Sequence, residues 1–263
     1  SSHHIVFYYN NTYTNYCSVH SWKNGICVEC NSIEEPQLVD DCYEIANYGN
    51  LIWFQRYVDA GNVNINAKLT SDIVANENLL DSSGNVQGTP KYNWTPIGRG
   101  YSSSSDSYNG VFDGIGYSIS GLYSNGTENY CGFFGKMNKG IIKNLSIVDS
   151  YFGENGRYYV GTFVGFGYGN IENCYSNATT VGKYYCGGIA GETKGTVSNC
   201  LYNGKIKGTM NSNAIASDRY NEGTITNCYY NENCGLSSSR ATAVTDDQLS
   251  SGEVAYLLNS DKS

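Results

Sequence analysis

One short pattern recurs through the second half of the chain, and it constrains the fold more than any other feature. A glycine is followed by any residue, then by isoleucine or valine, then by any residue and an asparagine. The four clear copies begin at Gly140, Gly169, Gly195 and Gly223, so that their asparagines lie 26 to 29 residues apart. A period of this length is typical of solenoids, in which each repeat is one supersecondary unit that stacks on the next.

Each copy follows a second glycine-rich run, and the apolar segments between the glycines are only about three to six residues long. Such segments are too short for helices, and they show no 3.6-residue period. Strands that advance in one direction and stack about 4.8 Å apart would bury them. The sequence therefore predicts an all-β fold, a right-handed parallel β-helix of about five or six coils spanning residues 41–235.

Equivalent positions of successive coils should stack into columns. The residue after the asparagine is leucine or cysteine, which indicates a buried apolar position, because free cysteine behaves as a small hydrophobe. An earlier, degenerate copy, "GYSISGLYS", would begin this column. The predicted wall column comprises Leu122, Leu145, Cys174, Cys200 and Cys228, and the predicted amide ladder comprises Asn144, Asn173, Asn199 and Asn227. Side-by-side stacking is poor geometry for disulfides between these cysteines.

A solenoid needs caps over its end coils. Leu51, Phe54 and Val58 have the spacing of one helix face, so we predict a capping helix at about 47–60, stopped by Gly61. At the other end, Thr245 and Gln248 fit a capping box, and we predict a helical cap over residues 236–263.

Residues 1–40 form a predicted small head with a cysteine–histidine motif. Cys17, His20, Cys27 and Cys30 make two short pairs around a loop that contains Asn-Gly, the strongest sequence signal for a hairpin turn. Three thiolates and one imidazole match a tetrahedral structural zinc site. Disulfides or free thiols remain the alternative, since exported proteins often pair their cysteines.

Two tyrosine pairs, 26 residues apart, suggest a binding surface. The segments "GRYYVG" and "GKYYCG" place the predicted ligand-binding residues in register: Arg157, Tyr158, Tyr159, Lys183, Tyr184 and Tyr185. Side chains alternate along a strand, so one tyrosine of each pair should face outward. Outward tyrosines beside a cation suit a protein or sugar ligand. The alternative is that these tyrosines are exposed cross-strand pairs of the sheet and bind no ligand.

Charge and composition exclude several classes of function. The formal net charge is −8, which disfavours nucleic acids and anionic membranes as partners. No run approaches the roughly 20 apolar residues of a membrane span. The three histidines lie at positions 3, 4 and 20, so the repeats contain no Ser-His-Asp or Cys-His catalytic set. The acidic residues of the coils fall at different columns and do not form a facing pair.

The motifs "GGIAG" and "GTVSNC", with their flanking segments over residues 41–263, resemble the GLUG-type repeat of surface proteins from Gram-positive gut and oral bacteria. This repeat also occurs beside the protease domain of bacterial immunoglobulin A proteases. The resemblance implies an extracellular or cell-surface location, a monomeric chain, and adhesin-like binding of a host protein, such as an immunoglobulin, or of a host glycan. A carbohydrate-active β-helix enzyme and a ligand-free stalk remain alternatives.

Overall fold

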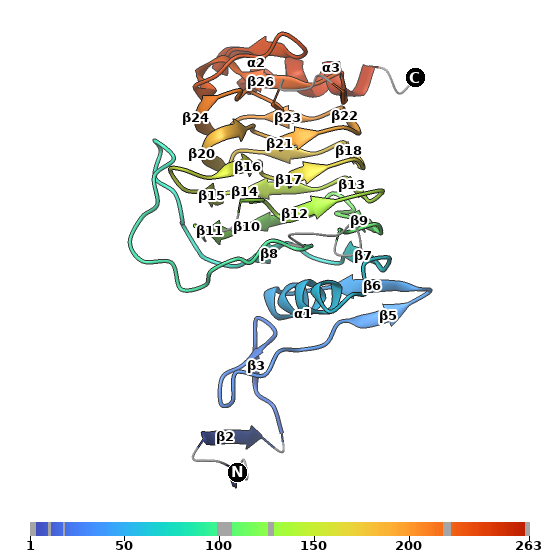
Figure 1. Ribbon diagram of the computed structural model, residues 1–263, viewed down its shortest axis with the longest axis vertical. Helices are drawn as coiled ribbons and strands as arrows, with labels where there is room; N and C mark the ends of the chain where they lie inside the picture. Colours follow the sequence, from blue (N-terminus) through green and yellow to red (C-terminus); the bar gives the residue numbers. More distant parts are fainter. Residues whose placement is uncertain are drawn as a thin grey trace.

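The computed structural model describes residues 4–9, 12–17, 19–98, 107–125, 129–217 and 222–260. It forms a parallel β-solenoid of about six turns with a few short helices, which confirms the predicted all-β fold. Figure 1 shows the turns stacked along the long axis of the molecule, from helix α1 near the N-terminal end to α2 and α3 at the C-terminal end. Four sheets built from strands of successive turns run along the stack.

Two large sheets carry most of the repeat pattern. The seven-stranded sheet contains, in spatial order, β8 (Ile73–Val74), β10 (Ser118–Ser120), β14 (Ser146–Val148), β19 (Tyr175–Ser176), β23 (Leu201–Tyr202), β26 (Tyr229–Asn231) and β27 (Thr242–Val244). The eight-stranded sheet contains β5 (Gln37–Val39), β6 (Cys42–Ile45), β7 (Asn66–Leu69), β9 (Val111–Asp113), β13 (Ile141–Lys143), β18 (Asn170–Glu172), β22 (Thr196–Ser198) and β25 (Thr224–Thr226). Only β5 and β6 pair in antiparallel fashion among these strands.

Two smaller sheets complete the turns. The third sheet contains β11 (Tyr123–Ser124), β15 (Tyr151–Gly153), β20 (Thr179–Cys186) and β16 (Tyr158–Val160), and β24 (Lys205–Met210) also pairs with β20. The fourth sheet contains β12 (Phe134–Met137), β17 (Val164–Gly167) and β21 (Ala190–Thr193). Two antiparallel hairpins precede the solenoid: β1 (His4–Tyr9) with β2 (Thr12–Cys17), and β3 (Trp22–Lys23) with β4 (Ile26–Cys27).

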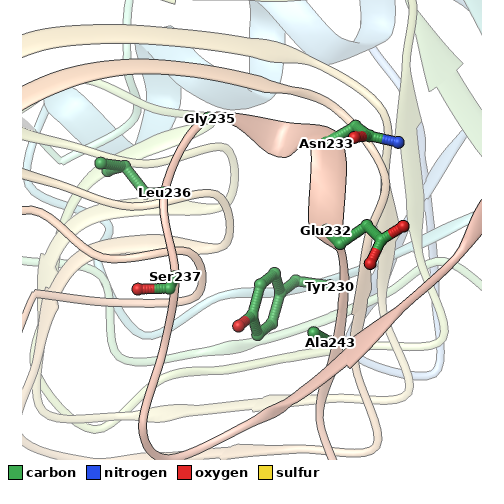
Figure 2. A pocket seen from close by; sticks show the side chains of 7 residues that line it. All are labelled: Tyr230, Glu232, Asn233, Gly235, Leu236, Ser237 and Ala243. Atoms are coloured by element: carbon green, nitrogen blue, oxygen red, sulfur yellow. The ribbon is translucent and has the colours of Figure 1, made fainter.

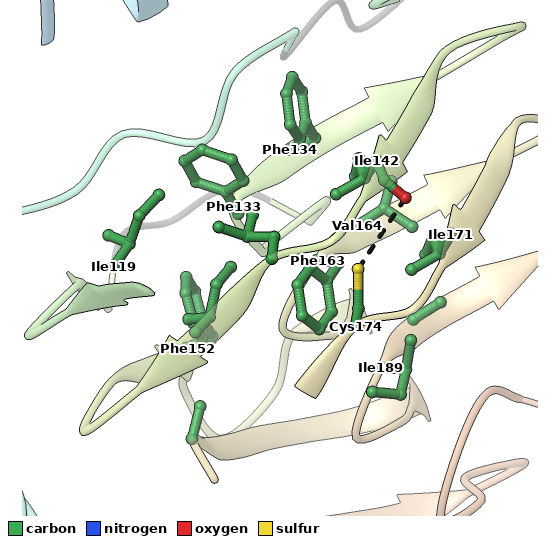
Figure 3. Close-up of a cluster of buried hydrophobic side chains, with 14 of the residues drawn as sticks. Ile119, Phe133, Phe134, Ile142, Phe152, Phe163, Val164, Ile171, Cys174 and Ile189 are labelled. Carbon is green, nitrogen blue, oxygen red and sulfur yellow. Dashed lines mark hydrogen bonds between the residues drawn. The ribbon is translucent and has the colours of Figure 1, made fainter. Parts of the chain in front are cut away.

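The core is a set of stacked apolar columns inside the turns. Ile142, Ile171 and Val197 are each the central residue of a three-residue strand, lie in register, and expose at most 1% of their surface. Figure 3 shows Ile142 and Ile171 among Phe133, Phe163 and other buried side chains. Each such side chain contributes about 1.5–3 kcal/mol when fully buried, so this stack is the main source of stability.

The predicted start of the wall column is wrong. The sequence pattern puts Leu122 in the column of Leu145. In the structure Ile119, three residues before Leu122, pairs with Ile147 of the seven-stranded sheet and not with Ile142. Leu122 is fully buried, but it belongs to a different corner of the turn. Successive strands of one turn both centre on isoleucine, so the period alone does not show which strand a degenerate copy matches.

The other members of the wall column do stack. Leu145, Cys174, Cys200 and Cys228 expose 0–3% of their surface. The three cysteines are free thiols, and each Sγ lies 3.2–3.3 Å from the backbone carbonyl two residues earlier. Cys174 Sγ also lies 3.9 Å from the Ile142 carbonyl, as the dashed line in Figure 3 shows. The thiols therefore pack as small apolar side chains of the wall column, and each S–H group is a weak hydrogen-bond donor to a backbone carbonyl.

The asparagine column forms two hydrogen-bonded pairs. All four asparagines have a left-handed backbone, with φ between 49° and 54°. Asn173 Nδ2 donates to Asn144 Oδ1 at 3.2 Å, and Asn227 Nδ2 donates to Asn199 Oδ1 at 2.7 Å. Between these pairs the predicted ladder is interrupted, because the buried Asn173 Oδ1 accepts no hydrogen bond. Asparagine suits the corner because it tolerates this backbone better than most residues.

Helices lie over both ends of the stack. Helix α1 (Tyr48–Asp59) begins after Asn47, whose side chain accepts from Asn50 N, and its stripe of Leu51, Phe54 and Val58 is buried as predicted. At the other end lie the 3-10 helix η2 (Glu232–Cys234), α2 (Asp246–Ser250) and α3 (Glu253–Ser260), and Thr245 and Gln248 form the predicted capping box. Within the described residues, no helix is both long and apolar enough to cross a bilayer.

Candidate functional site

The hairpin of β3 and β4 carries the predicted cysteine–histidine motif. Asn24 and Gly25, between the two strands, both have positive φ, of 51° and 73°. Two-residue hairpin turns of this type require positive φ at both positions, which is why Asn-Gly favours them. The sequence prediction of a hairpin at this place is confirmed.

This hairpin packs on the start of helix α1. Tyr48 N donates to Asn24 Oδ1 at 3.0 Å, and Gly49 N donates to the Asn24 carbonyl at 2.9 Å. A Cβ atom at Gly49 would lie 1.9 Å from the Gly25 carbonyl oxygen, so the contact requires glycine. The hairpin is therefore held against the N-terminal cap of the solenoid by hydrogen bonds to both the side chain and the backbone of Asn24.

Three of the four predicted metal ligands come together. The ligand atoms of His20, Cys27 and Cys30 all lie within 4.8 Å of one another, and Cys30 Sγ is 3.4 Å from His20 Nδ1. Ligand atoms around a tetrahedral zinc ion are about 3.3–3.8 Å apart, because the bonds are about 2.0–2.3 Å long. These three residues are close enough to hold a metal. Cys17 ends β2, but its side chain lies outside the described part of the chain.

The surroundings of the cluster favour a thiolate. Burial raises the pKa of Cys27, but hydrogen bonds from the backbone amide of Cys30 and from His20 outweigh this and lower the pKa to about 6. The hydrogen bond to Cys27 in turn raises the pKa of His20. A thiolate is the form of cysteine that binds metals.

The predicted tyrosine pairs lie in register and stack. Tyr158 pairs with Tyr184 across β16 and β20, with ring centroids 4.7 Å apart. Tyr159 stacks on Tyr185 at 4.8 Å, and Tyr130 extends that stack at 5.2 Å. We call the resulting surface the aromatic ridge; it comprises Tyr130, Tyr158, Tyr159, Phe166, Tyr168, Tyr184 and Tyr185.

The alternation of side chains expected along a strand does not hold within the ridge. Tyr159 and Tyr185 have φ of 56° and 54°, a left-handed conformation that is uncommon for residues other than glycine. The tyrosines therefore grade from exposed to buried: Tyr158 exposes 37% of its surface and Tyr185 only 9%. Sequence periodicity could not reveal this, because the positive φ of these two residues disturbs the regular alternation within β16 and β20.

Lysines lie beside the ridge at several rings. The Nζ atoms of Lys136, Lys183 and Lys194 lie 4.2, 5.2 and 5.6 Å from the ring centroids of Tyr130, Tyr184 and Tyr168. Arg157, the neighbour of Lys183 in the adjacent turn, pairs with Glu154 at 3.3 Å. Of the two predicted cations, Lys183 therefore lies over a ridge tyrosine, whereas Arg157 forms an ion pair with Glu154.

Among the hollows that the described residues form, two larger ones lie away from the ridge, and no sequence motif indicates either. A groove of about 940 Å³ separates the β3–β4 hairpin from residues 72–92, and Cys27 lines it. A hollow of about 600 Å³ lies at the C-terminal end of the stack, where Figure 2 shows the Tyr230 ring with Glu232 and Leu236 around it. Tyr230 continues the inward column of Tyr202, so this hollow lies where the core reaches its last turn.

The acidic residues of the coils bind neighbouring groups. Asp113 pairs with Lys143 at 3.3 Å, and Glu222 pairs with Lys194 at 2.9 Å. Asp149 accepts from the backbone amides of Leu79 and Leu80, a role that no local sequence signal indicates. Asp113 and Glu172 lie on either side of Lys143 in the eight-stranded sheet, so a lysine separates them.

Comparison with known proteins gives one structural likeness. No protein-family model matches the chain, and no curated protein matches it in sequence. Among solved structures, a putative immunoglobulin A1 protease from Bacteroides ovatus is similar, with 16% sequence identity and a TM-score of 0.45. The alignment covers 88% of this chain and 91% of that protein.

Proposed function

We propose that this chain is a non-catalytic binding module of an extracellular or surface-attached bacterial protein, and that it engages a host protein, such as an immunoglobulin, through the aromatic ridge. The observation that supports this most is the ridge itself, in which stacked tyrosines from successive turns stand beside three lysines. The bacterial and extracellular context comes from the resemblance of the repeats.

The ridge has the properties of a protein-binding surface. Tyrosine combines a large apolar ring with a polar hydroxyl, and it is enriched among residues that dominate binding energy. Stacking restrains the rings before binding, so little side-chain entropy is lost when a partner docks. Because neighbouring rings cover each other's faces, the ridge offers ring edges and hydroxyls to a partner. That arrangement suits the mixed surface of a protein better than the flat face of a sugar.

Affinity capture tests the proposal. The immobilised chain is exposed to serum and mucus, retained proteins are identified, and purified immunoglobulins are then titrated. We expect retention, and we expect the double variant Tyr158→Ala, Tyr184→Ala to weaken binding at least tenfold, since two interface tyrosines each contribute about 1 kcal/mol or more. Tyr256→Ala is the matched control, because Tyr256 is 74% exposed on α3, away from the ridge.

Other outcomes would favour the alternatives. Retention of no protein, together with a blank glycan array, would contradict binding through the ridge and leave a stalk as the function. Turnover of an acidic polysaccharide that is abolished by Asp113→Asn would instead favour a carbohydrate-active enzyme.

We also propose that His20, Cys27 and Cys30, with Cys17 as the fourth ligand, hold a structural zinc ion. The distances among the three described ligand atoms support this. Filled by four protein ligands, such a site has no open position for catalysis. Its role would be to fix the hairpin that packs on α1.

A further inference from the structure

Residues 76–92 form a strap that crosses the outer side of the third sheet. Figure 1 shows this segment, in teal, rising along the side of the stack toward β20 and β24. Asn76 Nδ2 donates to the Gly121 carbonyl at the base of the strap, and the carboxylate of Asp149 then accepts from Leu79 N and Leu80 N. The tip of the strap reaches one turn further, where the Gly84 carbonyl accepts from Thr179 Oγ1 at 2.8 Å.

Lys207 fixes the same tip from the following strand. Its Nζ donates to Asn85 Oδ1 at 2.9 Å. Asn85 N donates to Asp81 Oδ1 at 2.8 Å, which closes the turn of the strap. The strap is thus anchored to strands of three successive turns, and it lies over a sheet that would otherwise face solvent.

A pocket of about 320 Å³ remains between the strap and the sheet. Tyr123 and Tyr151, in register on β11 and β15, form one wall, with ring centroids 5.9 Å apart. The polar groups that line the pocket are the amides of Asn85 and Asn125, the carboxylate of Glu154 and the ammonium group of Lys207. The pocket therefore joins an aromatic wall to hydrogen-bonding groups of both donor and acceptor type.

Size and charge define the ligand that fits. Ligand pockets in proteins usually measure about 300–1,000 Å³, so this one holds a single ring rather than a chain of them. Glu154 and Lys207 bring one negative and one positive charge, which together favour a neutral ligand. A net charge of −8 on the whole chain also disfavours acidic ligands.

We propose that this pocket binds one neutral pyranose residue of a glycan. A pyranose has an apolar face of C–H groups, which packs on the tyrosine rings. Its hydroxyl groups both donate and accept, so they can donate to Glu154 and accept from Lys207 and the asparagine amides. This site is separate from the aromatic ridge and takes a different class of ligand, so it goes beyond the proposed function.

Saturation-transfer NMR tests the proposal on the full chain. The probes are the methyl glycosides of glucose, galactose, mannose and N-acetylglucosamine, each titrated alone. We expect at least one glycoside to receive saturation, and we expect Glu154→Gln and Lys207→Gln each to weaken its binding at least fivefold. Both substitutions change exposed polar groups, and glutamine at position 207 keeps a donor for Asn85 at the tip of the strap, so the circular dichroism spectrum should stay unchanged.

Matched variants separate this site from the ridge. Tyr158→Ala, which removes an exposed ridge ring, should leave glycoside binding unchanged, whereas Tyr151→Ala should weaken it and Tyr151→Phe should preserve it. Saturation of none of the four glycosides would overturn the proposal, as would binding that is insensitive to both Glu154→Gln and Lys207→Gln. Failure of protein capture by the ridge would not affect any of these results.

Discussion

At the scale of single residues, the asparagine column meets two demands at one position. The corner requires a left-handed backbone, and the Asn227–Asn199 hydrogen bond links adjacent turns. Replacing Asn199 by glycine removes the side chain but keeps the backbone, so we expect a loss of about 1 kcal/mol in the free energy of unfolding. Asn199→Ala loses the same hydrogen bond, and the left-handed conformation of alanine lowers the free energy of unfolding by about 1–2 kcal/mol more. Urea denaturation of the two variants measures both terms.

The order of the two variants decides the interpretation. If Asn199→Ala were as stable as Asn199→Gly, the backbone conformation would not be the reason for asparagine at this corner. Asn211→Gly, at an exposed position with the same left-handed backbone (φ of 51°), serves as a control for the general cost of introducing glycine.

The buried thiol of Cys186 makes stability depend on pH in the alkaline range. Burial raises its pKa to about 12, whereas an unfolded thiol has a pKa near 9. Below pH 9 both states keep the proton; above it the unfolded state ionises first, so stability falls as pH rises from about 9 to about 12. The slope from one such group is at most about 1.4 kcal/mol per pH unit.

Cys186→Ala provides the test of that slope. The variant should be less stable than the parent at pH 8, because a buried atom is lost, but its stability should decline less steeply between pH 9 and pH 10.5. Tyrosines titrate in the same range in both proteins, so the difference between the two curves isolates Cys186. Parallel curves would show that this thiol does not titrate on unfolding.

At the scale of elements, the sequence predicted those parts whose signal is local. The stripe of Leu51, Phe54 and Val58 located α1, and Asn-Gly located the hairpin, because each signal depends on residues that are close together in the sequence. The strap could not be predicted in this way. Its contacts with Asp149 and Thr179 join residues 70 and 95 positions apart, and no short-range pattern marks them.

The ridge and the wall column show where periodicity stops being sufficient. Repeat spacing brought Tyr158 and Tyr184 into the correct register, since equivalent residues of identical repeats must stack. It misplaced Leu122, because the strand around Ile119 matches the one around Ile147 and not the one around Ile142, and both of these centre on isoleucine. Repeat alignment could also have found Tyr130, because Cys131 pairs with Val160 and Tyr130 therefore holds the place of Tyr159 in the preceding turn.

The β3–β4 hairpin should depend on a metal. Purified chain should contain about one zinc ion, and Cys27→Ser should lose it, because one of the ligands is removed. We expect the hairpin to loosen and hydrogen exchange to rise over residues 19–34, while the solenoid stays folded on its own core. Cys42→Ser is the control, since Cys42 lies outside the cluster. Zinc content that is equal in Cys27→Ser and in the parent would contradict the proposed site.

At the scale of the whole molecule, β20 connects the two candidate binding surfaces. The hydroxyl group of its first residue, Thr179, donates to the Gly84 carbonyl at the tip of the strap, beside the pocket. Near its other end, β20 contains Tyr184 and Tyr185 of the ridge. Both surfaces therefore use the same rigid strand, and their separation is fixed by its eight residues. A partner that presents both a protein surface and a glycan could contact the two together, which would raise its apparent affinity above that of either site alone.

The strap also connects successive turns of the solenoid. Its contact with Asp149 offers a test of how strongly the strap is held. Asp149 accepts two backbone hydrogen bonds, at 2.8 and 2.7 Å, and has a left-handed backbone with φ of 45°. Asp149→Ala removes both acceptors, which should lower the free energy of local opening by about 2 kcal/mol. Hydrogen exchange at residues 79–87 should then accelerate roughly 30-fold, since each 1.4 kcal/mol corresponds to a factor of ten.

Asp149→Asn separates the two contributions, because asparagine tolerates the left-handed backbone and keeps one carbonyl oxygen as an acceptor. We expect its exchange rates to lie between those of the parent and of Asp149→Ala. The amides of Ile142 and Ile171 report on the core and should stay protected in all three proteins, because repeats of a solenoid contact mainly their neighbours. Acceleration at these core amides equal to that in the strap would mean that Asp149 stabilises the whole stack rather than the strap, and unchanged exchange at residues 79–87 would show that the strap is held elsewhere.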